Sequence, residues 1–140
     1  MREILFRGKF GSEWKYGYLN IEPQGLAIKE PYMCGASHIW CSINPETVGQ
    51  YTGLTDKNGN KIFEGDIIRC TLKSEEVDVL AVVKYGLYID VNSLWDYEYL
   101  GWYLTIKDKC ICISILSYEN DGLEFEIIGN IHDNPELLEE

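Results

Sequence analysis

Apolar and polar residues alternate along several short segments of the chain, which is the pattern of half-buried β-strands. Residues 3–10 alternate in this way, and the aromatic residues of segment 14–19 alternate after a turn at 11–13. These two arms predict an N-terminal β-hairpin with an aromatic face. Further short strands are expected at 26–28 and 38–43, and no long segment has the apolar period of a helix.

The tripeptide Asn44-Pro45-Glu46 is expected to end this N-terminal part. Proline cannot donate a hydrogen bond to a strand ladder, and it restricts the residue before it. We therefore predict an N-terminal β-meander region over residues 1–46 and a small β-barrel-like domain over residues 47–140. The alternative is that both parts form one compact unit.

The segment 47–69 has the strongest turn signals of the chain. Asn58-Gly59, within the turn Lys57–Lys61, suits a type I′ turn because both residues tolerate positive φ. Gly65 lies between two carboxylates and just before a β-branched run, so we expect a sharp bend there and a strand that opens at Gly65-Asp66. Small barrels use such bends, and we predict an SH3-like barrel.

The second half of the chain predicts further strands and one short helical turn. The expected elements are strands at 67–72, at 77–85 and, after a turn at Gly86, at 87–91; one or two strands within 92–109; a central strand at 110–118; and a strand at 123–127 that forms a hairpin with it. Asn134 and Pro135 suit the start of a C-terminal helical turn, with the asparagine as its cap. The predicted fold class is mainly β.

Composition narrows the classes of function. The chain has 140 residues, 46% of them hydrophobic, and a formal charge of -11, which repels nucleic-acid phosphates. It contains no apolar run long enough to span a membrane and no signal-peptide pattern. Five cysteines, an odd number, suit a reducing compartment better than a disulfide framework. We expect a soluble protein of the cytoplasm that binds neither membrane nor nucleic acid.

Several blocks of sequence, in the same order along nearly the whole chain, resemble the YopX family of phage and prophage proteins. These blocks are MREILFRGK, Trp14 with Tyr16–Leu19, Pro45–Leu54, DKNGNKIFEGDII, Ile127–Ile131 and Asn134–Leu138, whereas residues 74–109 match least. The resemblance implies a small, mostly β intracellular protein encoded by a phage or prophage. The biochemical function of the family is not established, so the resemblance assigns no catalytic or binding residues.

Candidate metal ligands are present but poorly spaced. Cys34, His38 and Cys41 lie close together in the sequence, and Cys110 and Cys112 would add two thiolates. Zinc fingers and ribbons need paired ligands in tight turns, whereas two cysteines one residue apart on a strand are ordinary buried residues. We expect no metal and no cofactor.

Catalytic patterns are equally weak. A cysteine nucleophile would need His38 or His132 as its base, yet no glycine-rich oxyanion turn accompanies either. Glu64 and Asp66 are expected to bond to backbone amides at the bend rather than to act as an acid–base pair. The glycine-rich run 49–53 lacks the lysine and the following helix of a phosphate-binding loop. We therefore expect no enzymatic activity.

Aromatic residues crowd the segment from Trp95 to Tyr103. Such a group either forms part of a small core or supplies the anchors of a protein interface. If the segment is a regular strand, Trp95 and Tyr99 share one face and Trp102 points to the other. We take Trp95, Tyr99 and Trp102 as candidate interaction residues.

Three hypotheses of function follow. The first is a non-enzymatic interaction module that binds itself, as a homo-oligomer, or another phage or host protein. The second is an acidic mimic of nucleic acid that modulates a basic DNA- or RNA-binding protein. The third and weakest is a small hydrolase. Acids clustered on one face would favour mimicry, whereas dispersed acids would indicate plain solubility.

Overall fold

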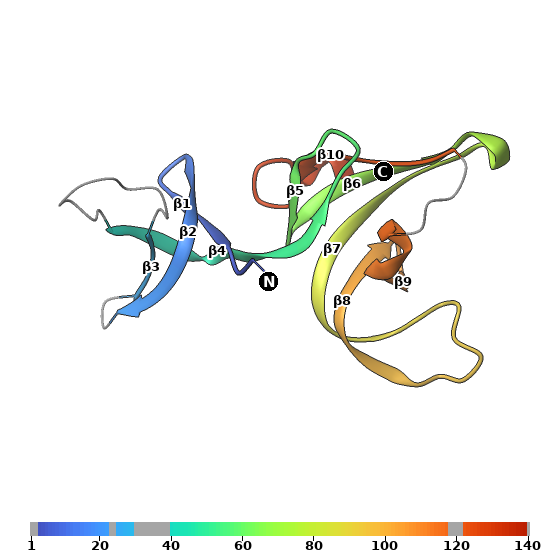
Figure 1. Ribbon diagram of the computed structural model, residues 1–140, viewed down its shortest axis with the longest axis horizontal. Helices are drawn as coiled ribbons and strands as arrows, with labels where there is room; N and C mark the ends of the chain where they lie inside the picture. Colours follow the sequence, from blue (N-terminus) through green and yellow to red (C-terminus); the bar gives the residue numbers. More distant parts are fainter. Residues whose placement is uncertain (1–2, 23–24, 30–39, 118–121, 140) are drawn as a thin grey trace. The chain divides into compact units, whose positions relative to one another are not determined.

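The computed structural model describes residues 3–22, 25–29, 40–117 and 122–139, and it is mainly β, as predicted. The strands are β1 (Phe6–Phe10), β2 (Glu13–Glu22), β3 (Gly25–Lys29), β4 (Trp40–Thr55), β5 (Lys61–Phe63), β6 (Asp66–Leu72), β7 (Val77–Ile89), β8 (Glu98–Ile106), β9 (Lys109–Cys112) and β10 (Leu123–Asn130). Short 3-10 helices are η1 (Lys73–Glu75), η2 (Ile113–Ser117) and η3 (Pro135–Leu138). Figure 1 shows their arrangement.

Two compact units divide the chain, Met1–Gly53 (unit 1) and Leu54–Glu140 (unit 2). The division falls later in the chain than the domain boundary predicted after residue 46, and β4 runs across it. The division into domains itself stays a prediction.

Unit 1 is built from antiparallel pairs. The predicted N-terminal hairpin is present, since β1 pairs with β2 from Phe6–Gly17 to Phe10–Glu13. The aromatic face of β2 lies opposite the charged face of β1: Trp14 is paired with Lys9, and its ring stacks with the buried Arg7 guanidinium at 4.5 Å. A cation above the indole face is attracted by the ring quadrupole.

The predicted strand end at Asn44-Pro45-Glu46 is wrong, because β4 continues through it. The register between β1 and β4 shifts here, as at a β-bulge, and a bulge tolerates proline. The Thr47 hydroxyl replaces a ladder bond: it accepts from the Lys9 N–H at 2.9 Å and donates to the Asn44 carbonyl at 2.6 Å. Side-chain bonds thus keep the strand paired where the backbone ladder is interrupted.

Unit 2 contains an antiparallel sheet in the order β10-β6-β7-β8-β9. Its outer strands, β10 and β9, are not joined to each other among the described residues, so the sheet is open and the SH3-like barrel is not confirmed. The predicted hairpin between segments 110–118 and 123–127 is also wrong, because β10 pairs with β6 instead. The connection that would form this turn, residues 119–122, lies mostly outside the described part.

Segment 110–118 is not a central strand. β9 ends at Cys112 as the edge of the sheet, and η2 follows. The alternating apolar residues predicted a strand here, but Ile113, Ile115 and Leu116 pack against the core from a helical turn. Their burial satisfies the apolar pattern without a ladder partner.

The predicted turn at Gly86 is likewise absent. β7 runs without a break from Val77 to Ile89, and Gly86 is paired with Gly101 of β8. Both glycines have positive φ, 149° and 157°. Because neither has a Cβ, the two strands can bend together here and stay paired.

The core of unit 2 lies on one face of this sheet. Its buried members are Ile62, Ile68, Cys70, Ala81, Val83 and Leu104. Five of them come from the adjacent strands β6, β7 and β8, where alternate residues of β6 and β7 face the core, as expected for strands with one buried face. Ile62 comes from β5, which belongs to the other sheet. Each fully buried aliphatic side chain stabilises the fold by about 1.5–3 kcal/mol.

The hairpin loop at residues 56–60 forms where predicted, but its turn type differs. Gly59 has a φ of 82°, whereas Asn58 does not have positive φ, so the turn is not type I′. The Asp56 side chain holds the loop in this conformation, because its Oδ1 accepts from the N–H groups of Asn58 and Asn60 at 3.0 and 2.9 Å. Its Oδ2 accepts from Ile127 of β10 at 3.1 Å, which ties the loop to the sheet.

Burial of Asp56 alone would raise the pKa of its carboxyl, but the N–H groups of Ile127, Asn60 and Asn58 together outweigh desolvation and lower the pKa below its ordinary value of 3.8. Hydrogen bonds to the charged form always act in this direction.

The bend at Gly65 is confirmed. Gly65 has a φ of 90°, donates its N–H to the Val83 carbonyl and accepts from the Ile131 N–H, both at 2.9 Å. β6 then begins at Asp66, which is 1% exposed and accepts from the Phe63 N–H at 2.7 Å. The carboxylate therefore bonds to a backbone amide, as expected.

The C-terminal turn η3 begins at Pro135 as predicted, but Asn134 does not cap it with its side chain. Its Oδ1 instead accepts from the Asn130 N–H at 3.3 Å, at the end of β10. The short helix is therefore held against the strand that precedes it.

Replacing Gly65 by valine should lower the free energy of unfolding by about 1–3 kcal/mol. A Cβ at this position would lie 3.5 Å from Ile131 Cγ1, which is an ordinary contact, so the cost comes from the backbone angle. Thermal and urea denaturation measure it, with Lys61→Val on the exposed side of β5 as the matched control. Equal stability of the two variants would contradict the prediction.

Replacing Asp56 by asparagine should cost about 1–3 kcal/mol at neutral pH, since charged hydrogen bonds to three amides are weakened. The folded-state pKa is lowered, so the stabilisation is complete above the ordinary value of 3.8 and is lost as the pH falls through the folded-state pKa.

Denaturation at several pH values should therefore show the difference between wild type and Asp56→Asn shrinking in acid. Asp96→Asn, at an exposed position, is the control and should follow the wild type. A difference that stays constant down to low pH would rule out the carboxylate as its source.

Candidate functional site

The predicted interaction residues lie at the end of the β7–β8 hairpin, in two different settings. Trp95 is 69% exposed in the connecting loop, and Tyr99 is 42% exposed in β8. Trp102, by contrast, is partly buried against the core and meets the Tyr85 ring edge-on at 5.1 Å. The structure thus separates two exposed rings from one that belongs mainly to packing.

The core face of the hairpin continues beyond the core. Val83 and Leu104 are paired and buried, and the next pair on this face, Tyr85 with Trp102, is partly covered. The pair after that is Leu87 with Leu100, which are 64% and 68% exposed. Since paired residues share a face and alternate residues return to it, one apolar row runs from the interior to solvent.

The opposite face of the hairpin is packed by aromatic rings. Tyr88 is 8% exposed and stacks on Tyr103 at 4.7 Å, while Tyr99 covers it at 5.8 Å. Burial raises the pKa of the Tyr88 phenol, so the ring stays neutral. Such aromatic pairs contribute about 0.5–1.5 kcal/mol each beyond the area they bury, which stiffens the hairpin.

The loop between β7 and β8 is fastened to β9 by Asp90. Its Oδ2 accepts from the Cys112 N–H at 2.8 Å and its Oδ1 from the Asn92 N–H at 2.7 Å. The Val91 N–H adds a bond to the Cys110 carbonyl at 2.9 Å. The Ser93 hydroxyl donates to the carbonyl of Trp95. The exposed rings of the loop therefore sit on a backbone with defined partners.

We call six exposed side chains of this hairpin the hairpin patch: Tyr85, Leu87, Leu94, Trp95, Tyr97 and Leu100. Sequence reasoning identified Trp95 but missed Leu87 and Leu100. The expected turn at Gly86 separated the segments that the structure pairs. The signal that could have found them is the matching spacing of Gly86-Leu87 and Leu100-Gly101 in two adjacent strands.

The thiols offer little chemistry. Burial raises the pKa of Cys70 to about 11, so this thiol is not ionised at neutral pH. Cys112 is partly desolvated, which opposes ionisation, but bonds from the Ser114 hydroxyl at 3.2 Å and from Tyr88 prevail and lower its pKa. These partners are hydroxyl groups, whereas nucleophilic catalysis needs a base.

No three His, Cys, Asp or Glu side chains gather as a metal-binding group in the described part of the chain. Of the candidate ligands, Cys34 and His38 lie outside that part. Cys41, Cys110 and Cys112 are described and form no disulfide.

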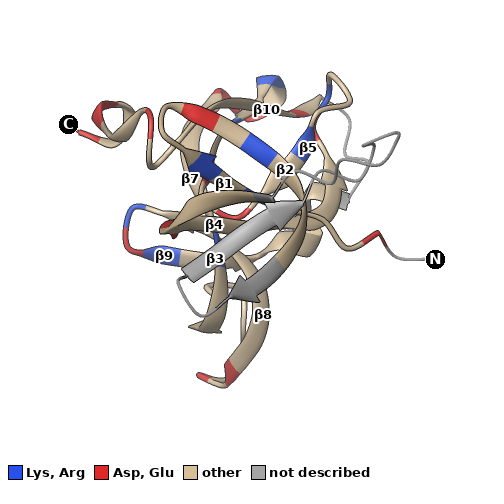
Figure 2. Ribbon diagram, turned by 90° about the vertical axis from the view of Figure 1, so that its left-hand side faces the viewer, with Lys and Arg blue, Asp and Glu red and all other residues tan. Residues whose placement is uncertain are grey.

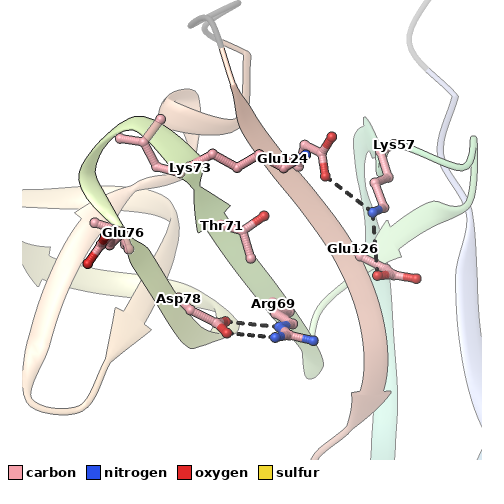
Figure 3. A pocket seen from close by; sticks show the side chains of 10 residues that line it. Lys57, Arg69, Thr71, Lys73, Glu76, Asp78, Glu124 and Glu126 are labelled. Carbon is pink, nitrogen blue, oxygen red and sulfur yellow. Dashed lines mark hydrogen bonds and ion pairs between the residues drawn. The ribbon is translucent and has the colours of Figure 1, made fainter.

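A hollow of about 420 Å³ lies over the outer face of β10, β6 and β7 and is shown in Figure 3. Its charges are mostly paired: Arg69 forms a two-pronged ion pair with Asp78 at 2.6 and 2.9 Å, and Lys57 lies 3.4 and 3.7 Å from Glu124 and Glu126. Acids and bases alternate across these strands, which is the character of a solvated face. This hollow presents no uniform charge to a ligand.

Nothing matches among the curated proteins, and no helix in the described residues is long and apolar enough to cross a membrane. The crystal structure of protein yopX from Bacillus subtilis is similar, with a TM-score of 0.52 and 21% identity over 99% of this chain and 100% of that one. The model of the YopX protein family matches residues 12–139. The chain therefore belongs to the YopX family.

Proposed function

We propose that this protein acts by binding another protein through the hairpin patch and catalyses no reaction. The observation that carries the proposal is the Leu87–Leu100 pair, side by side and about two-thirds exposed on a face that is fully buried only two residue pairs away. Covering such an apolar row with a partner removes apolar surface from water, which makes the free energy of binding more favourable.

Rigidity supports the same conclusion. The Tyr88 stack and the Asp90 bonds lie together on the face opposite the leucines, and both order the hairpin before any partner binds. A surface ordered in advance loses less conformational entropy on binding. Trp95 and Tyr97, both mostly exposed, are of the residue types that most often anchor protein interfaces.

The cellular setting belongs to the proposal as well. YopX membership supports a protein encoded by a phage or prophage and working in the cytoplasm of the bacterial host. The described cysteines are unpaired by disulfides, in keeping with a reducing compartment. The partner is then another phage or host protein, or a second copy of this chain.

The other two hypotheses find less support. Mimicry of nucleic acid would need acids clustered without bases, and the outer face of β6, β7 and β10 alternates the two. A hydrolase would need a nucleophile beside a base or a metal, and the thiol with the lowered pKa, Cys112, is bonded to hydroxyl groups. The hydrolase hypothesis is carried by no observation of its own.

The two tryptophans of the segment should behave differently when replaced by alanine. Trp102→Ala removes a ring packed on the core and should lower the unfolding free energy by about 2–4 kcal/mol. Trp95→Ala removes a ring that is 69% exposed and should leave stability nearly unchanged. Thermal denaturation compares them, and equal losses would show that Trp95 is also part of the core.

The double variant Leu87→Ser with Leu100→Ser should keep its melting temperature and lose the partner. Truncating a true anchor costs about 2 kcal/mol or more, roughly a thirtyfold loss of affinity. Tagged wild type and variant are compared by affinity capture from host cells, with the mass of each in solution measured in parallel.

The matched control is Leu138→Ser, at an exposed leucine of η3 far along the chain from the hairpin. A partner, or a second copy, retained by this control and lost by the double variant supports the proposal. Identical captured proteins and identical mass for wild type and double variant would refute it.

A further inference from the structure

We infer that the partner of the hairpin patch is a protein surface whose apolar side chains are flanked by lysine or arginine. The inference rests on the proposed function and adds the chemistry of the partner. The β7–β8 hairpin supplies both halves of the evidence, an apolar row and a charge of one sign around it.

The charged residues within the hairpin segment itself are all acidic over a long stretch of sequence. Residues 85–106 contain Asp90, Asp96 and Glu98 and no lysine or arginine. In Figure 2 the loop beyond β8 accordingly has red but no blue on its ribbon. This contrasts with the outer face of β6, β7 and β10, where Lys57 pairs with Glu124 and Glu126 and Arg69 pairs with Asp78.

Register places one of these carboxylates on the apolar face itself. Glu98 is paired with Ile89 and lies two residues from Leu100, so it projects on the same side as the Leu87–Leu100 pair. Lys84, the nearest base along β7, is paired with Tyr103 and projects on the opposite side. A partner that covers the leucines therefore meets a carboxylate at their edge.

A hollow beside the hairpin extends the acidic border. Its volume is about 600 Å³, and its lining includes Leu87, Ile89, Asp96, Glu98 and Asp108, with Lys109 the one base. An arginine or lysine side chain suits this lining, because its aliphatic stem contacts the apolar residues while its head meets the carboxylates. The exposed Trp95 and Tyr97 rings add faces on which a cation is favoured.

A second copy of the chain fits this border less well. Two such hairpins would bring like charges together, in molecules that each have a formal charge of -11. Repulsion of this kind disfavours self-association, whereas a basic partner is attracted and its association is accelerated at low salt. Apolar contact then provides affinity, and charge selects the partner.

The test uses an array of synthetic peptides with leucine and tryptophan at varied spacings, flanked by lysine, glutamate or serine in matched sets. Wild-type protein should bind lysine-flanked members more tightly than their glutamate counterparts, and added salt should weaken that binding. The variant Asp96→Asn with Glu98→Gln should lose about tenfold in affinity for them and show a flatter salt dependence.

The control variant, Glu136→Gln with Glu139→Gln, removes the same charge near the exposed C-terminal turn and should bind as wild type does. Equal binding of lysine- and glutamate-flanked peptides, or an equal loss of affinity in the control, would refute the inference that the partner is basic. Neither outcome would contradict the proposed function. Unchanged binding by Leu87→Ser with Leu100→Ser would overturn the hairpin patch and with it the proposed function.

Discussion

Continuous pairing of β7 with β8 across Gly86 and Gly101 is the constraint on which the candidate site depends. A side chain at either position would have to adopt an angle that residues with a Cβ rarely take. With glycine at both, the ladder passes the bend intact and extends the hairpin beyond the core. The residues after the bend keep the apolar character of the interior, yet no element of the described chain covers Leu87 and Leu100.

Elsewhere, where the strand pairing is irregular, polar side chains form the hydrogen bonds that a regular backbone ladder would provide. Thr47 joins β4 to β1 where the register shifts, and Asp56 joins the loop 56–60 to β10. Asp90 fastens the β7–β8 loop to β9 in the same manner. In each case an oxygen accepts from an amide that the sheet leaves without a regular partner, and leaving such a group unsatisfied would cost about 1–3 kcal/mol.

The fold by itself does not specify what this protein binds. A similarity of 21% identity to protein yopX establishes a shared architecture, and the same architecture can serve unrelated functions. What distinguishes the hairpin is the combination of a stiff backbone, an uncovered apolar row and a mainly acidic border. Hydrophobic contact is not directional, so under the proposed function the acidic border would be the part of the surface that discriminates between partners.

Local chemistry in the sequence determined the elements whose signals are short-range. The N-terminal hairpin, the bend at Gly65, the reversal at 56–60 and the mainly β class all follow from turn residues and alternation within a few positions. The blocks that resemble the YopX family are equally local and identified the family. Trp95 was found from its residue type, because a surplus of aromatic residues is visible in composition alone.

Only the tertiary structure decided which strands pair and which apolar residues stay uncovered. β10 joins β6 instead of β9, and η2 replaces half of an expected strand, because the core accepts apolar side chains from either conformation. Proline in β4 and glycine in β7 failed as stop signals, since a distant partner strand can compensate for a lost donor or a bend. Leu87 and Leu100 share a face only through this long-range pairing, which no local pattern specifies.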